Sequence, residues 1–279
     1  NSTLNNNNDA ILYNDDSSTL NNSGTLNNND GASLHNLEQS TLNNRGELNN
    51  NGSLEIYNSG TLNNSGTLNN SGELNNNGSL LNLSSGYLAN DGTIDNLNNQ
   101  SANGIINSGT YTGTGKIKGH FTDDGTVKPG NSAGGMLITG DYYKRGGSTE
   151  IQLGGTDDGA GIRTATEHDW IEITGDLELA GELDVSLIDK FKLSAGDFFV
   201  ITKVGGKRTG QYEGLDEGDS VGEFESDDDG DPLELFITYE GGDEGKDIEL
   251  YTEPVSGALP ESLSEPRMIG SDADDSLTG

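Results

Sequence analysis

Residues 59–76 read SGTLNNSGTLNNSGELNN, a six-residue unit that occurs three times in succession. The unit contains one leucine, two asparagines, a small residue, a glycine and then Thr, Ser or Glu. Outward from this stretch, one apolar residue recurs every six or eight positions. The series comprises Leu20, Leu26, Leu34, Leu42, Leu48, Leu54, Leu62, Leu68, Leu74, Leu80, Leu88 and Ile94. Two steps of six and one of eight predict a superrepeat of about 20 residues.

This spacing does not suit a helix, which would place apolar residues three and four positions apart. A short strand followed by a corner fits, with leucine on one face and with Thr and the first Asn on the other. Gly and the second Asn tolerate the left-handed backbone that a corner needs. Stacked coils place leucine above leucine every ~4.8 Å. The sequence therefore predicts an all-β fold, a parallel β-helix with about three short sides per coil and the leucine series as its interior ladder.

The eight-residue steps carry additional apolar residues, namely Leu37, Ile56 and Leu83. We expect these steps to form one longer side of each coil. The count changes near residues 62–80, where either one coil is larger or the long side moves to another face.

Asparagine is concentrated in the repeat, since residues 1–110 contain 32 of the 33 Asn in the chain. Stacked Asn side chains can form hydrogen-bonded amide ladders. Alternatively, Asn serves only to form left-handed corners. Both interpretations are structural, and a sugar-binding role for the Asn face is a third alternative.

Composition excludes several classes of protein. Apolar residues make up 29% of the 279 residues, too few for a compact α/β enzyme core, and there is no Cys for a disulfide scaffold. The net charge of −33 repels nucleic acid, and no apolar run is long enough for a membrane span. Such a charge favours a salty, calcium-containing exterior. We therefore expect a secreted, extracellular or cell-surface protein.

The character of the chain changes after residue 107, where Asn almost disappears and longer alternating segments begin, such as WIEI at 170–173 and LELFITY at 233–239. We predict four segments. These are an Asn/Leu/Gly solenoid over 1–128, a C-terminal β-rich region over 129–252, a Pro/Ser/Glu linker over 253–268 and a distinct tail over 269–279.

Residues 129–142, PGNSAGGMLITGDY, resemble a segment near the C-terminal end of the β-helix in autotransporter-type passenger proteins. The resemblance continues through ITGDLELAGELDVSLI at 173–188 and ends in 212–218 and 237–243, so that it covers roughly 129–252. Asp216 stands where the family usually has Pro, and Glu244-Gly245-Lys246 replaces its usual Gly-Asn-Asp. The resemblance implies a right-handed parallel β-helix whose C-terminal region continues or caps the solenoid.

Residues 270–279, GSDADDSLTG, are similar to the first nonapeptide of an RTX (haemolysin-type) calcium-binding repeat. Asp275 and Leu277 match the family's Asp and apolar positions, whereas Ser271 and Ala273 replace two glycines. The resemblance implies an incomplete Ca²⁺ site at Asp272, Asp274 and Asp275, since successive turns share the ion. It also implies type I secretion and a longer parent protein that continues into RTX repeats, as in a secreted bacterial adhesin or surface-layer protein.

Other motifs favour structural interpretations. Residues 130–134, GNSAG, match the G-x-S-x-G pattern of a nucleophile elbow, but no helix follows, so we predict a solenoid corner. The three histidines lack metal spacing and are expected at surface or coil-edge positions: His35, His120 and His168. The acidic stretch 227–232 is either a solvated loop or a loose Ca²⁺ site.

These observations favour a non-enzymatic extracellular structural or adhesive protein, which acts as a stiff spacer, filament or surface-layer component. We expect it to self-associate through solenoid ends or faces, because unpaired strand edges template further pairing. Cell-surface polysaccharide is a second expected partner. One alternative is a carbohydrate-active β-helix enzyme, which would need opposed carboxylates along a groove. The other is a calcium-dependent binding module.

Overall fold

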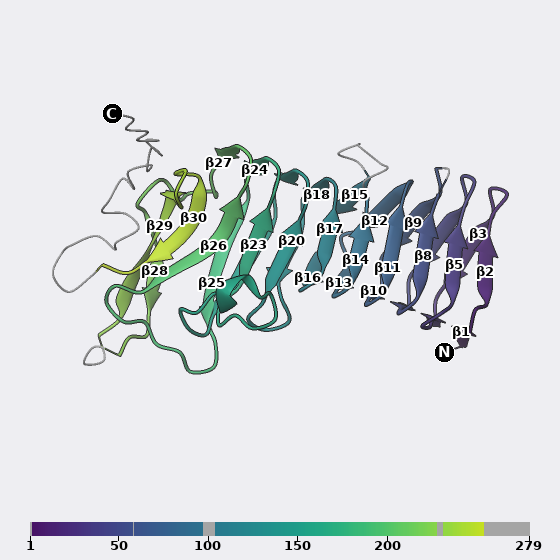
Figure 1. The fold of residues 1–279 in the computed structure, drawn as a ribbon, viewed down its shortest axis with the longest axis horizontal. Helices are drawn as coiled ribbons and strands as arrows, with labels where there is room; N and C mark the ends of the chain where they lie inside the picture. Colours follow the sequence, from purple (N-terminus) through teal and green to yellow (C-terminus); the bar gives the residue numbers. More distant parts are fainter. Residues whose placement is uncertain (1, 58, 97–103, 228–230, 254–279) are drawn as a thin grey trace, which may run out of the picture.

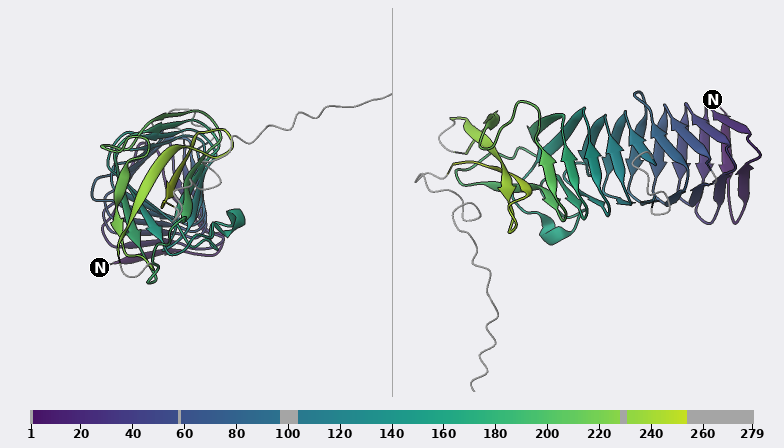
Figure 2. Two further views of the ribbon diagram at one scale, coloured as in Figure 1. Left: turned by 90° about the vertical axis from the view of Figure 1, so that its left-hand side faces the viewer. Right: turned by 90° about the horizontal axis from the view of Figure 1, so that it is seen from above.

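The structure is a computed structural model that describes residues 2–57, 59–96, 104–227 and 231–253. It is an elongated β-solenoid with three parallel sheets, here called A, B and C (Figure 1). Seen along its length, the coils superpose around one interior (Figure 2, left). The predicted all-β parallel solenoid is therefore confirmed. The described residues contain one short helix, the 3₁₀ turn η1 (Gly159–Gly161).

Each sheet is built from every third strand of the chain. Sheet A contains β1 (Thr3–Asn6), β4 (Thr25–Asn28), β7 (Glu47–Asn50), β10 (Thr67–Asn70), β13 (Tyr87–Asn90), β16 (Thr110–Gly113), β19 (Thr126–Pro129), β22 (Ser148–Leu153) and β25 (Glu182–Leu187). Sheet C contains β3 (Thr19–Asn22), β6 (Thr41–Asn44), β9 (Thr61–Asn64), β12 (Ser79–Asn82), β15 (Ile105–Asn107), β18 (Phe121–Asp123), β21 (Tyr142–Lys144), β24 (Leu177–Leu179) and β27 (Arg208–Gly210).

Sheet B has the same parallel part and an antiparallel extension. The parallel strands are β2 (Ile11–Asn14), β5 (Ser33–Asn36), β8 (Ser53–Ile56), β11 (Glu73–Asn76), β14 (Thr93–Asp95), β17 (Lys116–Lys118), β20 (Gly135–Ile138), β23 (Trp170–Ile173) and β26 (Phe198–Val204). The extension adds β30 (Asp247–Tyr251), β29 (Leu233–Gly241) and β28 (Ser220–Phe224) to the edge of β26. The C-terminal region thus both continues the solenoid and ends it with antiparallel strands.

In the repeat, equivalent positions of successive coils pair with one another in parallel register. Leu48 pairs with Leu26 on one side and with Leu68 on the other, and the flanking Thr, Glu and Asn positions follow in register. Leu26 and the later members of the leucine series are buried, whereas Leu20 in β3 is only partly buried because it has a coil on one side only. Each fully buried leucine contributes about 2 kcal/mol of transfer free energy.

The eight-residue steps between leucines arise from longer corners and not from longer strands, because the strands on either side of them have four residues like the others. The interpretation as a longer side was therefore wrong. In the first two coils, four-residue corners join sheet A to sheet B, as at 29–32, and also sheet B to sheet C, as at 37–40. Glu38 and Gln39 adopt left-handed backbone in the second of these. In the third coil only the corner from sheet B to sheet C, at 57–60, is long. At 83–86 the long corner instead joins sheet C to sheet A. The change near 62–80 is therefore a move of the long corner to another edge of the solenoid.

Glycines such as Gly46 and Gly66 in the repeat allow close stacking and do not have the left-handed φ angles that we predicted for corner glycines, whereas Gly31 does, with φ 76°. A Cβ atom on Gly46 would lie 2.0 Å from the carbonyl oxygen of Gly24 in the preceding coil. A Cβ atom on Gly66 would likewise lie 2.1 Å from the carbonyl oxygen of Gly46. Only glycine lets consecutive coils approach this closely.

Candidate binding groove above a buried polar ladder

The second Asn of each unit points into the solenoid, because it lies two residues after the inward leucine on the same strand face. These amides stack into what we call the inner ladder. In sheet C, each side-chain amide donates to the next side-chain oxygen over 2.5–2.8 Å in the order Asn22, Asn44, Asn64, Asn82, Asn107 and Asp123. Sheet A has an equivalent ladder through Asn6, Asn28, Asn50, Asn70 and Asn90.

The first Asn of each unit forms a second ladder on the outer face of the strands, which we call the outer ladder, and its members Asn27, Asn49 and Asn69 are half-buried. Asn49 donates to Asn27 over 2.9 Å, and Asn69 donates to Asn49 over 2.8 Å. Amide ladders are therefore the correct interpretation of the Asn bias. The corner interpretation was wrong for these asparagines, which lie within strands, but it holds for Asn8, which has a left-handed backbone at the corner between β1 and β2.

The inner ladder also fixes the strands that follow each corner. The Asn82 amide donates to the carbonyl of Thr110 over 2.9 Å, and the Asn107 amide donates to the carbonyl of Thr126 over 3.3 Å. Both of these amides also reach a corner glycine, Gly86 or Gly109, over 3.3 Å. One buried side chain thus joins its own coil, the next coil and the corner between sheets C and A.

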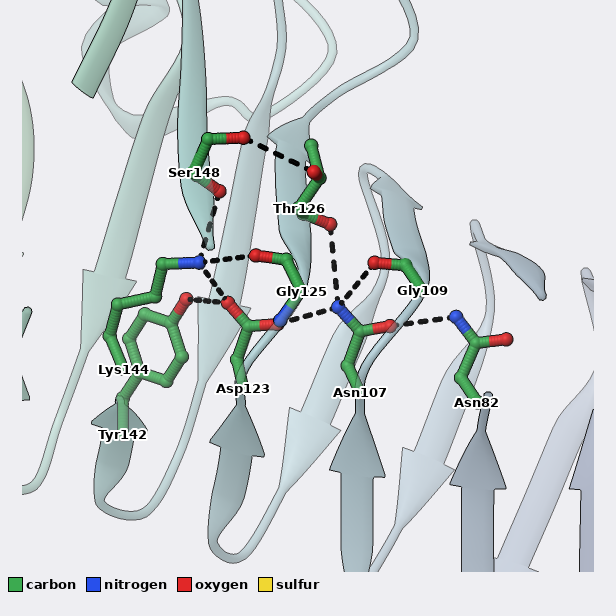
Figure 3. A network of polar contacts seen from close by, with 9 residues as sticks. All are labelled: Asn82, Asn107, Gly109, Asp123, Gly125, Thr126, Tyr142, Lys144 and Ser148. Atoms are coloured by element: carbon green, nitrogen blue, oxygen red, sulfur yellow. Dashed lines mark hydrogen bonds and ion pairs between the residues drawn. The ribbon is translucent and has the colours of Figure 1, made fainter. Parts of the chain in front are cut away.

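A buried ion pair terminates the ladder of sheet C (Figure 3). The side chains of Asp123 and Lys144 are both 0% exposed and in direct contact. Asp123 also accepts from Asn107, from the Tyr142 hydroxyl and from the Gly125 N–H. Lys144 donates further to the carbonyls of Gly125 and Ser148, over 2.7 and 3.0 Å. The charges are therefore enclosed by partners, as a buried pair requires.

Burial raises the pKa of the Asp123 carboxyl and lowers the pKa of the Lys144 ammonium, while the attraction between the two groups opposes both shifts. The surroundings favour the ionised pair, because Asp123 receives several donors and Lys144 faces two carbonyls in addition to the carboxylate.

Above this network lies an open groove of about 630 Å³ along the edge between sheets C and A, which we call the corner groove. It passes over successive two- or three-residue corners rich in glycine, whereas the long corner at Ser84 and the loop at Gln211 and Glu213 bound its ends. Its lining comprises Gly109, Gly125, Gly146, Gly147 and Gly181, the hydroxyl residues Ser108, Thr110, Thr126 and Ser148, and the charged residues Arg145 and Glu182.

Three hydroxyl residues of the groove form one row along sheet A. Thr110 pairs with Thr126, and Thr126 pairs with Ser148, in parallel register. The Thr126 and Ser148 hydroxyl oxygens lie 3.1 Å apart. The exposed Tyr87 precedes this row and Glu182 follows it. The arrangement offers repeated hydroxyl donors and acceptors on a fixed backbone.

The calcium ligands implied by the RTX resemblance, Asp272, Asp274 and Asp275, lie outside the described residues, as do 254–279 in general. Among the residues that the structure describes, no group of three or more His, Asp or Glu side chains is arranged to hold a metal ion. The acidic stretch 227–232 is described only in part.

Two histidines are partly exposed, as expected for surface or coil-edge positions: His35 lies on the outer face of β5, and His120 lies in the corner before β18. The ring of His35 is 3.4 Å from Glu55, and that of His120 is 3.1 Å from Asp141. The prediction was wrong for His168, which is buried and packs edge-to-face on Phe199. Burial lowers the pKa of His168, so that its ring is neutral near pH 7.

The G-x-S-x-G segment is a corner between β19 and β20, as predicted, and β20 follows it directly. Gly130 and Ser132 have positive φ angles of 78° and 92°. The buried Asp169 holds this corner, because it accepts from the backbone N–H groups of Gly134 and Gln152 over 2.8 and 2.9 Å. Burial raises the pKa of Asp169 to about 8. Sequence reasoning missed this residue, since nothing in the local pattern separates it from the exposed acids nearby.

No protein-family model matches this chain, and no curated protein matches it significantly. In the part of the chain that the structure describes, no helix has the length and apolar character needed to cross a membrane.

Proposed function

We propose that this protein is a non-enzymatic structural element of the cell exterior, a stiff spacer within a larger surface or secreted assembly. The observation that carries the proposal is the unbroken inner ladder of sheet C, which joins successive coils from β3 to β18 through their side chains and ends on Lys144 in β21. Side-chain bonds add to the backbone bonds of the sheets and resist bending between coils. Nine stacked strands extend for about 38 Å.

The exterior location rests on charge and on resemblance. A net charge of −33 is tolerated best where salt and divalent cations screen it. The autotransporter-like segment and the RTX-like tail both suggest a secreted bacterial protein, and the RTX-like tail further suggests export by a type I route. In this proposal Asp272, Asp274 and Asp275 contribute ligands to an RTX-type Ca²⁺ site.

The N-terminal face supports self-association through the solenoid end. Strands β1, β2 and β3 have a neighbour on only one side among the described residues. Leu4, Ile11 and Tyr13 are 49%, 47% and 54% exposed there. We propose that a further coil of the same kind stacks on this face, from the same polypeptide or from a second copy.

A coil deletion tests the spacer role. Removal of residues 47–66 takes out one 20-residue coil and joins Gly46 to Thr67, which restores the repeat. The shortened protein should fold cooperatively, and small-angle X-ray scattering should show it shorter by one step of ~4.8 Å. Removal of 47–56 alone breaks the register and should unfold the chain. Immunogold labelling of producing cells tests the location, and label confined to the cytoplasm would contradict it.

The corner groove favours a second candidate, a carbohydrate-active enzyme, because it contains the carboxylates of Glu182 and Glu213. We favour the scaffold because both of these residues are exposed, whereas a general acid is usually shielded from water. Release of reducing sugar from a panel of polysaccharides, lost in Glu182→Gln, would establish the enzyme instead.

A calcium-dependent binding module is the third candidate, and the acidic C-terminal part favours it. Added millimolar Ca²⁺ would then raise the melting temperature by mass action. Unchanged melting in chelator and in Ca²⁺ would exclude this role for residues 1–279.

A further inference from the structure

We propose that the corner groove binds an extended, uncharged glycan that lies parallel to the solenoid axis. This inference names a ligand class for the proposed surface element and would make the spacer an adhesive one. The two proposals fail separately, because the spacer role depends on the ladders within the solenoid and the glycan role depends on the groove outside it.

The shape of the groove suits a linear polymer. Its lining comes from six successive levels, from Ser84 through Gly109, Gly125, Gly146 and Gly181 to Gln211. Five steps of ~4.8 Å give a length of about 24 Å. An extended pyranose chain advances by a similar distance per sugar, so that each coil can meet one sugar residue. A compact ligand would leave most of this length empty.

The hydroxyl row is held in place before any ligand binds. The buried side chain of Asn82 donates to the backbone carbonyl of Thr110. In the same way Asn107 donates to the carbonyl of Thr126 and Lys144 to that of Ser148 (Figure 3). These three hydroxyl residues are among those that line the groove. Their backbone positions are therefore fixed from below, which lowers the entropy cost of binding. Sugar hydroxyls both donate and accept, as Ser and Thr hydroxyls do.

Charge selects against an anionic polymer. The protein carries −33 overall, and the groove contains Glu182 and Glu213 against the single cation of Arg145. A polyuronate or a nucleic acid would meet net repulsion along this surface. Neutral sugar hydroxyls can instead donate to the two carboxylates and accept from the Arg145 guanidinium.

An exposed aromatic ring stands where the row begins. Tyr87 is 43% exposed and pairs in register with Thr110, the first hydroxyl residue of the groove. The apolar face of a pyranose ring packs well on such a side chain, which gains contact area at low conformational cost. We infer that the glycan begins over Tyr87 and runs toward Glu182.

The test is calorimetric titration of the intact chain with cellohexaose, mannohexaose and maltohexaose, and with hexagalacturonate as the anionic probe. Gly146→Leu fills the groove without strain, because a Cβ atom on Gly146 meets no atom within 4 Å and its φ is not in the left-handed range. Ser53→Leu places the same side chain on sheet B, away from the groove. Thr126→Val removes one lining hydroxyl at constant shape.

We expect at least one neutral hexasaccharide to bind. Gly146→Leu should weaken it by about tenfold or more, Thr126→Val by a few fold, and Ser53→Leu not at all. Melting temperatures check that each variant is folded. The proposal is overturned if no neutral glycan binds, if only hexagalacturonate binds, or if folded Gly146→Leu and Thr126→Val both bind as the unmodified protein does. None of these outcomes affects the coil-deletion result.

Discussion

The ammonium of Lys144 contacts the carboxylate of Asp123 inside the solenoid, at the level where the asparagine ladder of sheet C ends. The two residues occupy the position in β18 and β21 that Asn fills in the earlier coils. The pair thus takes over the ladder's function with charged groups, because it accepts from Asn107 below and donates to Ser148 above.

Asp123→Asn is expected to destabilise the protein by about 3–5 kcal/mol, because it leaves the Lys144 ammonium buried without its counter-charge. Urea unfolding at neutral pH measures the loss. The exposed pair of Lys128 and Glu150 is the matched control, and Lys128→Gln should cost no more than about 1 kcal/mol. Equal effects of the two substitutions would show that the interior pair is not shielded from water.

Asn64→Ala should lower the free energy of unfolding by about 2 kcal/mol or more, whereas Asn63→Ala should lower it by less than about 0.5 kcal/mol. Asn64 accepts from Asn44 and donates to Asn82 and to the Tyr87 carbonyl inside the solenoid. Asn63 lies on the outer ladder, where water can replace its partners. Thermal unfolding of the two variants compares them directly, and a larger loss for Asn63→Ala would reverse our assignment of inner and outer faces.

Two glycine substitutions should have different effects on the free energy of unfolding. Gly46→Ala places Cβ 2.0 Å from the Gly24 carbonyl and should cost about 3 kcal/mol or more. Gly146→Ala meets open space and should be neutral or stabilising by up to about 1 kcal/mol, through the unfolded state. Melting temperatures of both variants provide the measurement. Tolerance of Gly46→Ala would mean that the coils are spaced more widely than the structure shows.

Stability should fall as the pH rises from about 5 to about 9. Burial raises the pKa of Asp169 from 3.8 to about 8 and that of Glu249 from 4.5 to about 7. Each group binds its proton more tightly when folded, so its contribution is complete below its unfolded pKa and is lost as the pH rises through the folded value.

The variant Asp169→Asn, combined with Glu249→Gln, should flatten this dependence when unfolding free energy is measured across the same pH range. Glu234→Gln is the control, because Glu234 is exposed on β29 and should leave the slope unchanged. A double variant with the slope of the unmodified protein would assign the pH dependence to the general negative charge instead.

Leucine spacing was sufficient to predict the solenoid, since steps of six and eight allow only short strands and corners. Which Asn points inward could also have been predicted, because the second Asn lies two residues after leucine on the same strand face, as in Thr41–Asn44. The Asp123–Lys144 ion pair and the corner groove could not have been predicted from the sequence. The pair requires the register between β18 and β21, and the groove requires the relative lengths of corners in coils far apart in sequence.

Exchange of Asn side-chain amide protons with deuterated solvent, followed by NMR, tests the central claim most directly. The inner amides of Asn44, Asn64 and Asn82 should be strongly protected, with exchange limited by opening of the coils. The outer amides of Asn43 and Asn63 should exchange much faster than the inner amides, because their ladder lies at the surface. Equal exchange rates for the two sets would contradict a buried ladder, and with it the stiff scaffold proposed for this protein.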